Sequence, residues 1–468
     1  MESKFLTEIL ASGDIVDNQE YLASGHILRN HRLGEIELKE PYRVNNAEFY
    51  RRAFEFLGRD VVKVNEKIKR NKDEIFLFGS KDYEHNSDDP FINFTGFNRG
   101  NFKIKTGNII GEIKVNGYNL KIGSRFGDNF LRYIISDAEG FLEIENSGGI
   151  NKKSSYDWLI YHLWLTKLKK AFRLGIPKNY IKKEENLTYI RGSVDVIKYY
   201  QNKNSAILTC NYSSLSRENP ATNLIATVFK RNEKNSIFKN QIRLRSAFYI
   251  ASGGNFVKPH DIDRINPFSN PYYHSYNEVI SLSKLILKRK SLEFGDKSEE
   301  SAFLFDVSML FEYFVKRLFR RSGLNVLDKF SNAKRITKGF NKKHELQPDI
   351  VLEEEGKFAI FDVKYKSFDP RYGVKREDLF QLHTYVGQYS NYGKVTSAGF
   401  VYPMSQKNFE KLNLGKSVNS EKLSVGGKIL DFYILFVVVP DADNFSEFSS
   451  LFHSNNEIFQ NTITKIMD

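Results

Sequence analysis

The sequence has a single cysteine, Cys210, among its 468 residues. One cysteine excludes an internal disulfide framework and any zinc site built from several cysteines. Long apolar stretches are missing as well: the longest, residues 432–440, is far below the roughly 20 residues of a membrane-spanning helix. Residues 1–6 show no basic segment leading into an apolar core, so no signal peptide is indicated. We therefore expect a cytoplasmic protein that makes no membrane contact.

Several catalytic motifs are missing too. No Gly-rich loop of the Walker type occurs, so we do not expect this chain to hydrolyse nucleotides by itself. The nine histidines form no His-Glu-x-x-His motif, which argues against a zinc hydrolase. No Gly-x-Ser-x-Gly elbow is present, which argues against a serine hydrolase.

Apolar residues are abundant by contrast, at 41% of the sequence, and the length suggests about three domains. Residues 1–150 contain short apolar segments between turn-forming clusters, including a hairpin at 110–122, and predict a β-rich domain for docking or partner binding. Residues 151–300 show helical spacing from Tyr156 onward and predict a mainly helical central region. Residues 301–468 predict a mixed sheet flanked by helices. The expected fold class is therefore multidomain α/β.

Basic residues exceed acidic ones, with a formal net charge of +13 and a pI near 9.3. Such a charge favours a polyanionic partner but does not establish one. Residues 151–200 hold eleven Lys and Arg against four acids, and residues 316–343 hold ten against Asp328 alone. The second stretch directly precedes the candidate site described next, which favours a phosphate-tracking surface. A solvated basic face is the alternative.

The strongest functional signal is a predicted β-hairpin that carries charges beside apolar runs. Its first strand follows Asp349, and its second strand, residues 358–365, contains Asp362 and Lys364. Strand residues two apart point to one face, roughly 7 Å from each other. Burying such charges costs several kcal/mol unless they are paired or hold a metal. The pattern predicts a catalytic site, although an Asp followed by Asp-x-Lys also occurs by chance.

Two predicted helices flank this hairpin. In the helix expected at residues 303–321, Glu312 lies within an apolar stripe, which is unusual for an acid. In the helix expected at 377–389, Gln381 and Tyr385 are four residues apart and share a face. We expect Glu312 to be an outer acid of the site. Gln381 and Tyr385 are expected to hold the lysine or a phosphate, with simple packing as the alternative.

These residue types suit the hydrolysis of a phosphodiester bond. Mg²⁺ prefers about six oxygen ligands, usually one or two carboxylates with waters and substrate oxygens. Asp349 and Asp362 are the expected metal ligands, with Glu312 beside them, and Mn²⁺ is a candidate substitute for Mg²⁺. Lys364 is expected to orient or deprotonate the attacking water, or to stabilise the phosphate. The residues therefore predict a metal-dependent nuclease.

The segment from Glu312 to Tyr385 resembles the PD-(D/E)xK nuclease superfamily, with Asp349, Asp362 and Lys364 at its signature positions. The phrase Phe-Asp-Val-Lys-Tyr-Lys at 361–366 is similar to McrC, the endonuclease subunit of McrBC-type restriction systems. Further segments that carry this resemblance are residues 190–195, 210–212, 219–225, 310–313 and 381–385. Residues 105–111 and 122–127 resemble the LlaJI-type branch of that group, so the resemblance covers roughly residues 100–440.

The resemblance implies that nucleotide hydrolysis and DNA cleavage are carried out by two different proteins. McrC-like subunits act on double-stranded DNA with a separate McrB-like AAA+ GTPase hexamer, so GTP is bound by that partner and not by this chain. Arg125 and Arg191 lie in the carried-over segments and are expected to contact the motor. A buried ion pair, such as Arg191 with Asp195, is the alternative. The first hundred residues match no pattern, so the motor-docking surface is not assigned.

Three functional hypotheses follow. The first is an Mg²⁺-dependent endonuclease subunit of a two-component, GTPase-driven restriction system that acts against phage or foreign DNA. The second is a catalytically inactive DNA-binding or motor-adaptor protein. The third is a stand-alone repair nuclease of RecB-like type, which shares the Gln-x-x-x-Tyr helix.

Overall fold

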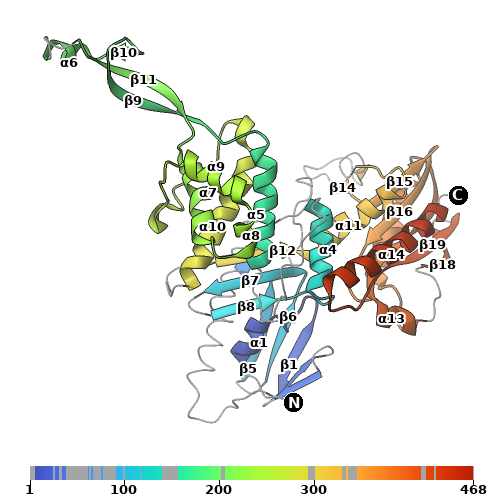
Figure 1. The fold of residues 1–468 in the computed structure, drawn as a ribbon. Helices are drawn as coiled ribbons and strands as arrows, with labels where there is room; N and C mark the ends of the chain where they lie inside the picture. Colours follow the sequence, from blue (N-terminus) through green and yellow to red (C-terminus); the bar gives the residue numbers. More distant parts are fainter. Residues whose placement is uncertain are drawn as a thin grey trace.

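The computed structural model describes most of the chain, in segments separated by gaps. The described residues are 6–24, 27–30, 34–37, 59, 62, 65–66, 75–76, 91–98, 101–115, 118–139, 157–201, 206–293, 301–328, 334–335, 345–412, 418–425 and 428–466. They form a mixed α/β structure with several sheets, as the sequence predicted. Figure 1 shows an N-terminal β region, a helical central region with a projecting arm, and a C-terminal sheet flanked by helices.

Two sheets build the N-terminal region. One has the strand order β3-β2-β1-β6-β5 and the other β4-β12-β7-β8. Their strands are β1 (Glu20–Ser24), β2 (Ile27–Asn30), β3 (Gly34–Glu37), β4 (Ile75–Phe76), β5 (Ile92–Asn98), β6 (Asn101–Thr106), β7 (Ile109–Val115), β8 (Tyr118–Ile122) and β12 (Ser301–Asp306). Helices α1 (Leu6–Ser12) and α4 (Asp128–Glu139) belong to the same region. The predicted hairpin at 110–122 is confirmed as β7 and β8, although its Asn-Gly turn lies outside the described residues.

Strand β12 corrects one expectation. The helix predicted from Phe303 begins only at Val307, and residues 301–306 pair antiparallel with β7 instead. Both the burial of these residues in a sheet and a local helix cap explain why the helix begins later than predicted. Phe303, Leu304 and Phe305 are all buried, which a strand inside a sheet achieves, and Asp306 caps the helix by accepting a bond of 2.8 Å from the backbone N–H of Ser308.

The central region is a bundle of helices around Trp164. The helix predicted from Tyr156 is present as α5 (Asp157–Phe172), and the Trp164 indole donates a hydrogen bond of 2.7 Å to Ser283 Oγ. Phe229 and Phe238 lie against the same indole ring, with centroids at 5.0 and 5.5 Å. The other helices are α7 (Pro220–Arg231), α8 (Ser236–Lys239), α9 (Ile242–Ala251) and α10 (Ser275–Glu293), with the 3₁₀ turns η4 (Pro259–Asp261) and η5 (Pro271–Tyr273).

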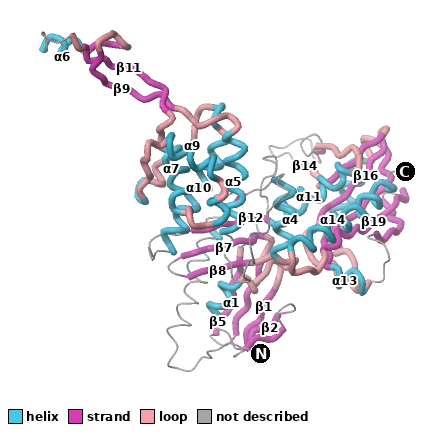
Figure 2. The backbone as a smooth tube through the Cα atoms, viewed as in Figure 1, coloured by secondary structure: helices cyan, strands magenta, loops and turns pink. Residues whose placement is uncertain are grey.

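A two-stranded arm projects from this bundle (Figure 1, Figure 2). Its strands β9 (Asn179–Leu187) and β11 (Leu208–Ser216) are antiparallel, and β10 (Ser193–Val194) and α6 (Val196–Gln201) lie at its far end. The sequence predicted a mainly helical region with interruptions here and did not predict the two-stranded arm. Strand β9 alternates half-buried and exposed side chains and has no fully buried position, so it lacks the apolar pattern by which strands are usually recognised.

The C-terminal region is built on a sheet of order β15-β16-β17-β19-β18. Strands β16, β17 and β19 run parallel, and both edge strands are antiparallel to their neighbours. The elements are α11 (Val307–Arg321), β13 (Lys334–Arg335), β14 (Glu345–Leu346), β15 (Ile350–Glu354), β16 (Lys357–Val363), α12 (Arg376–Tyr389), β17 (Lys394–Ser405), α13 (Gln406–Lys411), β18 (Val418–Val425), β19 (Lys428–Val439), α14 (Phe445–Ile463) and η6 (Thr464–Ile466). The predicted hairpin, the helix after it and both later strands are confirmed.

The two faces of this sheet belong to different cores. Phe361 and Val437 face α11 and α14, and this core continues into the N-terminal and central regions. Ile360 and Phe400 face α12 and form a separate core with Leu382. Because strand residues alternate between faces, Asp362 points to the α12 side, together with Ile360. The candidate site therefore lies on the face that α12 covers.

We predict opposite effects for two alanine substitutions in this region. Gly399 pairs with Tyr433 in the sheet, and an added Cβ would lie 2.1 Å from the Tyr433 carbonyl oxygen. Gly399→Ala should therefore lower the free energy of unfolding by about 2–4 kcal/mol. Gly387 in α12 has open space around its Cβ position, so Gly387→Ala should raise it by about 0.5–1 kcal/mol. Urea denaturation measures both, and equal effects of the two changes would contradict this description.

Candidate active site

Asp349 and Asp362 face each other across the hairpin. Ile350 pairs with Phe361, and continuing this antiparallel register by one residue places Asp349 opposite Asp362. The Asp349 carboxylate accepts a hydrogen bond of 2.8 Å from the backbone N–H of Val363, which fixes it at the end of β16. Asp362 is only 2% exposed. The hairpin thus brings two carboxylates together at one end of the sheet, as the sequence predicted.

Lys364 lies beside this pair and is held by two further predicted residues. Its Nζ is 2.5 Å from Asp362 Oδ2 and donates a hydrogen bond of 2.8 Å to Gln381 Oε1. The Gln381 side chain in turn donates a bond of 2.8 Å to the Tyr385 hydroxyl. Gln381 and Tyr385 share one face of α12, and Tyr385 packs into the core under the sheet. The chain from Tyr385 through Gln381 fixes the position of the ammonium group.

Burial and charge set the protonation of these groups. Burial, together with the neighbouring Asp349 carboxylate, raises the pKa of Asp362 well above its ordinary value, although Lys364 opposes the shift. Burial by itself would lower the pKa of Lys364, but Asp362 outweighs it and the net shift is upward. The ammonium group is therefore kept charged at neutral pH, while the raised pKa of Asp362 favours a proton or a bound cation at that carboxyl group.

The structure adds two residues, Asp378 and Lys366, that the sequence did not predict as part of the site. Asp378 lies in the first turn of α12, and its carboxylate is 3.8 Å from Lys364 Nζ and forms an ion pair with Lys366. Residues 378, 381 and 385 are spaced by three and four positions on one helical face, so helical periodicity was the signal that could have found Asp378. Asp378 joins the two lysines and thereby ties the start of α12 to the end of β16.

Glu312 lies on α11, which packs against the sheet from the other side. Phe311 on the same helix lies 5.5 Å from the ring of Tyr365, the residue that follows Lys364. The Glu312 charge is one of several influences, after burial, that raise the pKa of Tyr385. Among the residues that the structure describes, no group of three or more His, Cys, Asp or Glu side chains is arranged to hold a metal ion. A direct ligand role for Glu312 thus stays a prediction.

The donor set of the hairpin fits a hard divalent cation. Asp349 and Asp362 form a locally anionic site, and burial together with the Asp349 charge raises the pKa of Asp362. A bound cation would reduce the repulsion between the two carboxylates. Mg²⁺ is commonly bound by one or two carboxylates, with waters and substrate phosphates completing its shell. Asp349 and Asp362 would hold the ion, and no closed cage of protein ligands is needed.

The two arginines with a predicted partner role lie in different environments. Arg125 is buried, pairs with Asp17 at 3.8 Å, and stacks over the ring of Tyr365 at 4.6 Å. Arg191 lies at the far end of the arm, exposed, with its guanidinium 4.0 Å from the ring of Tyr212. The expected alternative partner of Arg191, Asp195, pairs with Lys198 at 3.8 Å. The geometry of Arg191 suits contact with another molecule, and that of Arg125 suits packing between regions.

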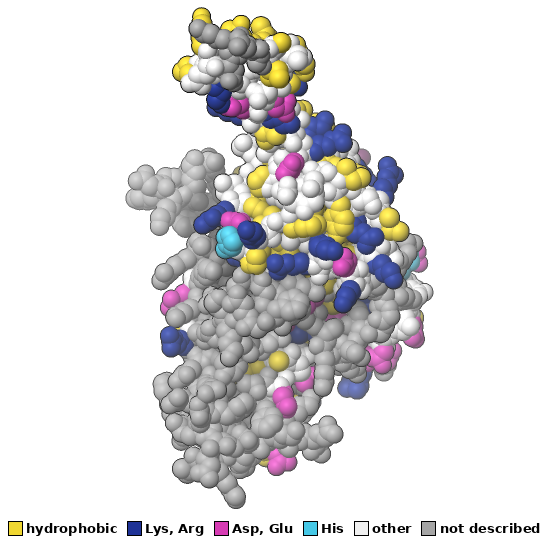
Figure 3. Space-filling view, turned by 60° about the vertical axis from the view of Figure 1, so that its left-hand side comes forward, with side chains coloured by type: hydrophobic (Ala, Val, Ile, Leu, Met, Phe, Trp, Pro, Cys, Tyr) yellow, Lys and Arg dark blue, Asp and Glu magenta, His cyan; other side chains and the backbone are white. Residues whose placement is uncertain are grey.

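Basic side chains are spread over the central region and the arm. Figure 3 shows Lys and Arg side chains around this part of the molecule, with hydrophobic side chains at the end of the arm. Of the second basic stretch, residues 329–333 and 336–343 lie outside the described residues. No helix in the described parts of the chain is long and apolar enough to cross a membrane.

A mixed α/β protein with a carboxylate pair and a lysine on one hairpin is thus the class that fold and site define. The model of the family "McrBC 5-methylcytosine restriction system component" matches residues 104–403, well over half of the chain. The protein therefore belongs to this family.

A comparison with solved structures gave similar chains, among them two from Thermococcus gammatolerans. A chain from the half-complex of Thermococcus gammatolerans McrB AAA+ hexamers with bound McrC has a TM-score of 0.52 and 15% identity, covering 87% of this chain and 94% of that chain. A cryo-EM structure of the Thermococcus gammatolerans McrBC complex has a TM-score of 0.34 and 16% identity, covering 58% and 82%. The first likeness supports the fold alone. A search of curated proteins found no match.

We predict that Mg²⁺ stabilises the protein in a pH-dependent manner. A proton on Asp362 competes with the cation, and its pKa is raised, so the stabilisation should grow as pH rises from about 5.5 to 8. Saturating Mg²⁺ should raise the Tm of the EDTA-treated protein by roughly 2–5 °C near pH 8. Differential scanning fluorimetry measures this shift. Asp349→Asn and Asp362→Asn should each reduce it, and an unchanged shift in both variants would exclude these residues as ligands.

Proposed function

We propose that this chain is the Mg²⁺-dependent DNA endonuclease component of a McrBC-type restriction system. The observation that carries the proposal is the opposition of Asp349 and Asp362 at one hairpin, with Lys364 held between Asp362 and Gln381. A carboxylate pair with an adjoining lysine on a hairpin, backed by a Gln-x-x-x-Tyr helix, is the constellation of the PD-(D/E)xK superfamily. Family membership is consistent with this proposal. Assignment to the LlaJI-type branch rests on residues 105–111 and 122–127.

Each side chain has a defined task in this proposal. A cation bound here would supply an activated water and would neutralise charge that develops on the phosphate. Asp349 and Asp362 hold the cation at the end of the hairpin. Lys364, whose pKa is raised by the neighbouring carboxylates, acts as a charged donor toward the phosphate or the attacking water. Gln381 and Tyr385 keep that donor in place.

Double-stranded DNA is the proposed substrate, and an AAA+ GTPase hexamer is the proposed partner. The net charge of +13 favours a polyanion. The structurally similar chain comes from an assembly of McrB AAA+ hexamers with bound McrC, which motivates the same type of partner here. The arm is the best candidate contact, because Ile190, Ile197 and Tyr200 near its end are 68%, 72% and 62% exposed. Apolar side chains gathered at an exposed end are typical of interaction sites.

We predict that Asp362→Ala and Lys364→Ala each lower DNA cleavage at least about a hundredfold, because each removes a group that acts on the reacting phosphate or its metal. Cleavage of supercoiled plasmid is measured with Mg²⁺, GTP and the partner GTPase. Lys422→Ala is the matched control: Lys422 also pairs with an aspartate of this sheet, Asp431, but both side chains are exposed. The control should cleave as the parent does.

The same assay separates the alternative functions. Full cleavage by the double variant of Asp362 and Lys364 would refute the proposed site. No cleavage by the parent chain under any condition would favour an inactive adaptor. Cleavage by the purified chain without GTP or a partner would favour a stand-alone repair nuclease.

We also predict that Arg191→Ala weakens functional coupling to the partner. Arg191 is exposed at the end of the arm, so its loss should lower the stimulation of the partner's GTPase about tenfold and leave the Tm unchanged. The measurement is GTP hydrolysis at increasing concentrations of this chain. Lys183→Ala, which removes an arm lysine paired with Glu185, is the control and should stimulate normally. Equal stimulation by both variants would argue against contact at the arm's end.

A further inference from the structure

A tight turn connects the strand of Lys364 to α12. Asp369 organises it: its side-chain Oδ1 accepts a bond of 2.8 Å from the backbone N–H of Arg371, and its carbonyl oxygen accepts one of 2.8 Å from Gly373. Gly373 has a φ of +64°, which only glycine adopts readily. Arg371 and Tyr372 are therefore held at the apex of a turn whose backbone is fixed from within.

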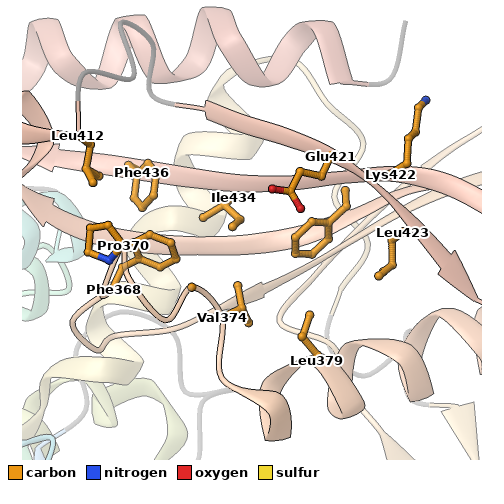
Figure 4. Close-up of a pocket in the computed structure, with 12 residues that line it drawn as sticks. Phe368, Pro370, Val374, Leu379, Leu412, Glu421, Lys422, Leu423, Ile434 and Phe436 are labelled. Atoms are coloured by element: carbon orange, nitrogen blue, oxygen red, sulfur yellow. The ribbon is translucent and has the colours of Figure 1, made fainter.

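The inner side of this turn is apolar and anchored to the sheet. The ring of Phe368 lies 5.3 Å from Tyr402 and 5.2 Å from Phe436. Figure 4 shows the side chains of Phe368 and Val374 on the connecting segment below the strands, lining an apolar cavity of about 420 Å³. The turn thus has an anchored inner side, and its apex faces away from the core.

The outer side of the turn and the start of α12 combine aromatic rings with positive charge. Tyr372 is 85% exposed and Phe380 is 56% exposed, with the Arg376 guanidinium 5.1 Å from the Phe380 ring. Arg371 and Lys375 are exposed as well. The acids of this surface are Glu377, which is exposed, and Asp369, whose carboxylate is engaged within the turn. Exposed rings interleaved with cations are the composition of surfaces that bind nucleic acids.

This surface is joined to the candidate site through the first turns of α12. Asp378 donates its backbone N–H to the carbonyl of Lys375 at 3.1 Å, and its carboxylate reaches Lys364 and Lys366. Phe380 directly precedes Gln381, which binds Lys364. The exposed Arg376 and Phe380 and the groups that hold the lysine thus lie on the same helix, on different faces of it.

We propose that Tyr372 stacks on a base of the DNA duplex next to the bond that is cut, while Arg371, Lys375 and Arg376 contact the flanking phosphates. This inference rests on the proposed nuclease function. A fixed turn presents the ring without the entropic cost of ordering a loop. A ring that enters a base step partly unstacks it and bends the duplex, which helps to hold the scissile phosphate at the carboxylate pair.

Duplex binding by a cleavage-deficient chain tests this inference. In the full-length Asp362→Asn chain, binding to a fluorescein-labelled 30-base-pair duplex is followed by anisotropy in Mg²⁺ buffer. Adding Tyr372→Ala should weaken the affinity about tenfold, because stacking on one base contributes a factor of this size. Tyr372→Phe keeps the ring and should retain the affinity. Arg371→Ala should reduce the slope of log affinity against log salt by about one.

Tyr392→Ala is the matched control, since Tyr392 is 55% exposed just beyond the other end of the same helix. Unchanged affinity in Tyr372→Ala, or a loss as large in Tyr372→Phe or Tyr392→Ala, would overturn the stacking role. Failure of the Asp362→Asn chain to bind duplex at low salt would overturn it too. If the parent chain cleaves but Tyr372→Ala binds normally, only this inference fails. If the parent does not cleave but Tyr372→Ala loses affinity, the nuclease proposal fails and the binding surface stands.

Discussion

The opposition of two carboxylates at the end of one hairpin is the constraint around which the C-terminal region is organised. Asp349 and Asp362 face each other where the apolar part of β16 ends, and Asp362 is buried. Like charges that face each other in this way destabilise each other unless a cation intervenes. Lys364, the residue that follows β16, supplies one positive charge, and α12 supplies the Gln381 and Asp378 contacts that keep it there. The parallel strands behind the hairpin provide a rigid base, which a site of this kind requires.

The alternation of strand side chains links this site to the rest of the molecule. Lys364 faces α12, whereas the next residue, Tyr365, faces the opposite side and packs against Phe311. Arg125 stacks on Tyr365, and the Asn18 side chain donates to its carbonyl oxygen at 3.4 Å. Two consecutive residues thus connect the candidate site and the N-terminal region. A displacement of the N-terminal region relative to the sheet would move Tyr365, and the peptide bond between Lys364 and Tyr365 would pass that movement to the lysine.

Features that depend on residues close together in the sequence could be predicted from it, whereas features that depend on distant residues could not. The sequence displays the spacing of two residues between Asp362 and Lys364, the spacing of four between Gln381 and Tyr385, and the short hairpin that brings Asp349 opposite Asp362. Strand β12 pairs with β7 from nearly two hundred positions away, and no local pattern reveals that pairing. The arm was missed because β9 buries no side chain completely. The burial of Arg125 depends on Asp17 and Tyr365, which are distant in sequence.

The end of the arm and the candidate site are stabilised by different sets of contacts. At the far end of the arm, Cys210 is buried and pairs with Val194, and an added Cβ at Gly192 would lie 2.3 Å from the Asn211 carbonyl oxygen. This small folded end keeps its geometry with few contacts to the bundle. The candidate site lies in another region, on a different sheet. Under the proposed function, substitutions at the arm's end would change partner binding without altering the carboxylate pair, so the two proposed activities would be physically separable within one chain.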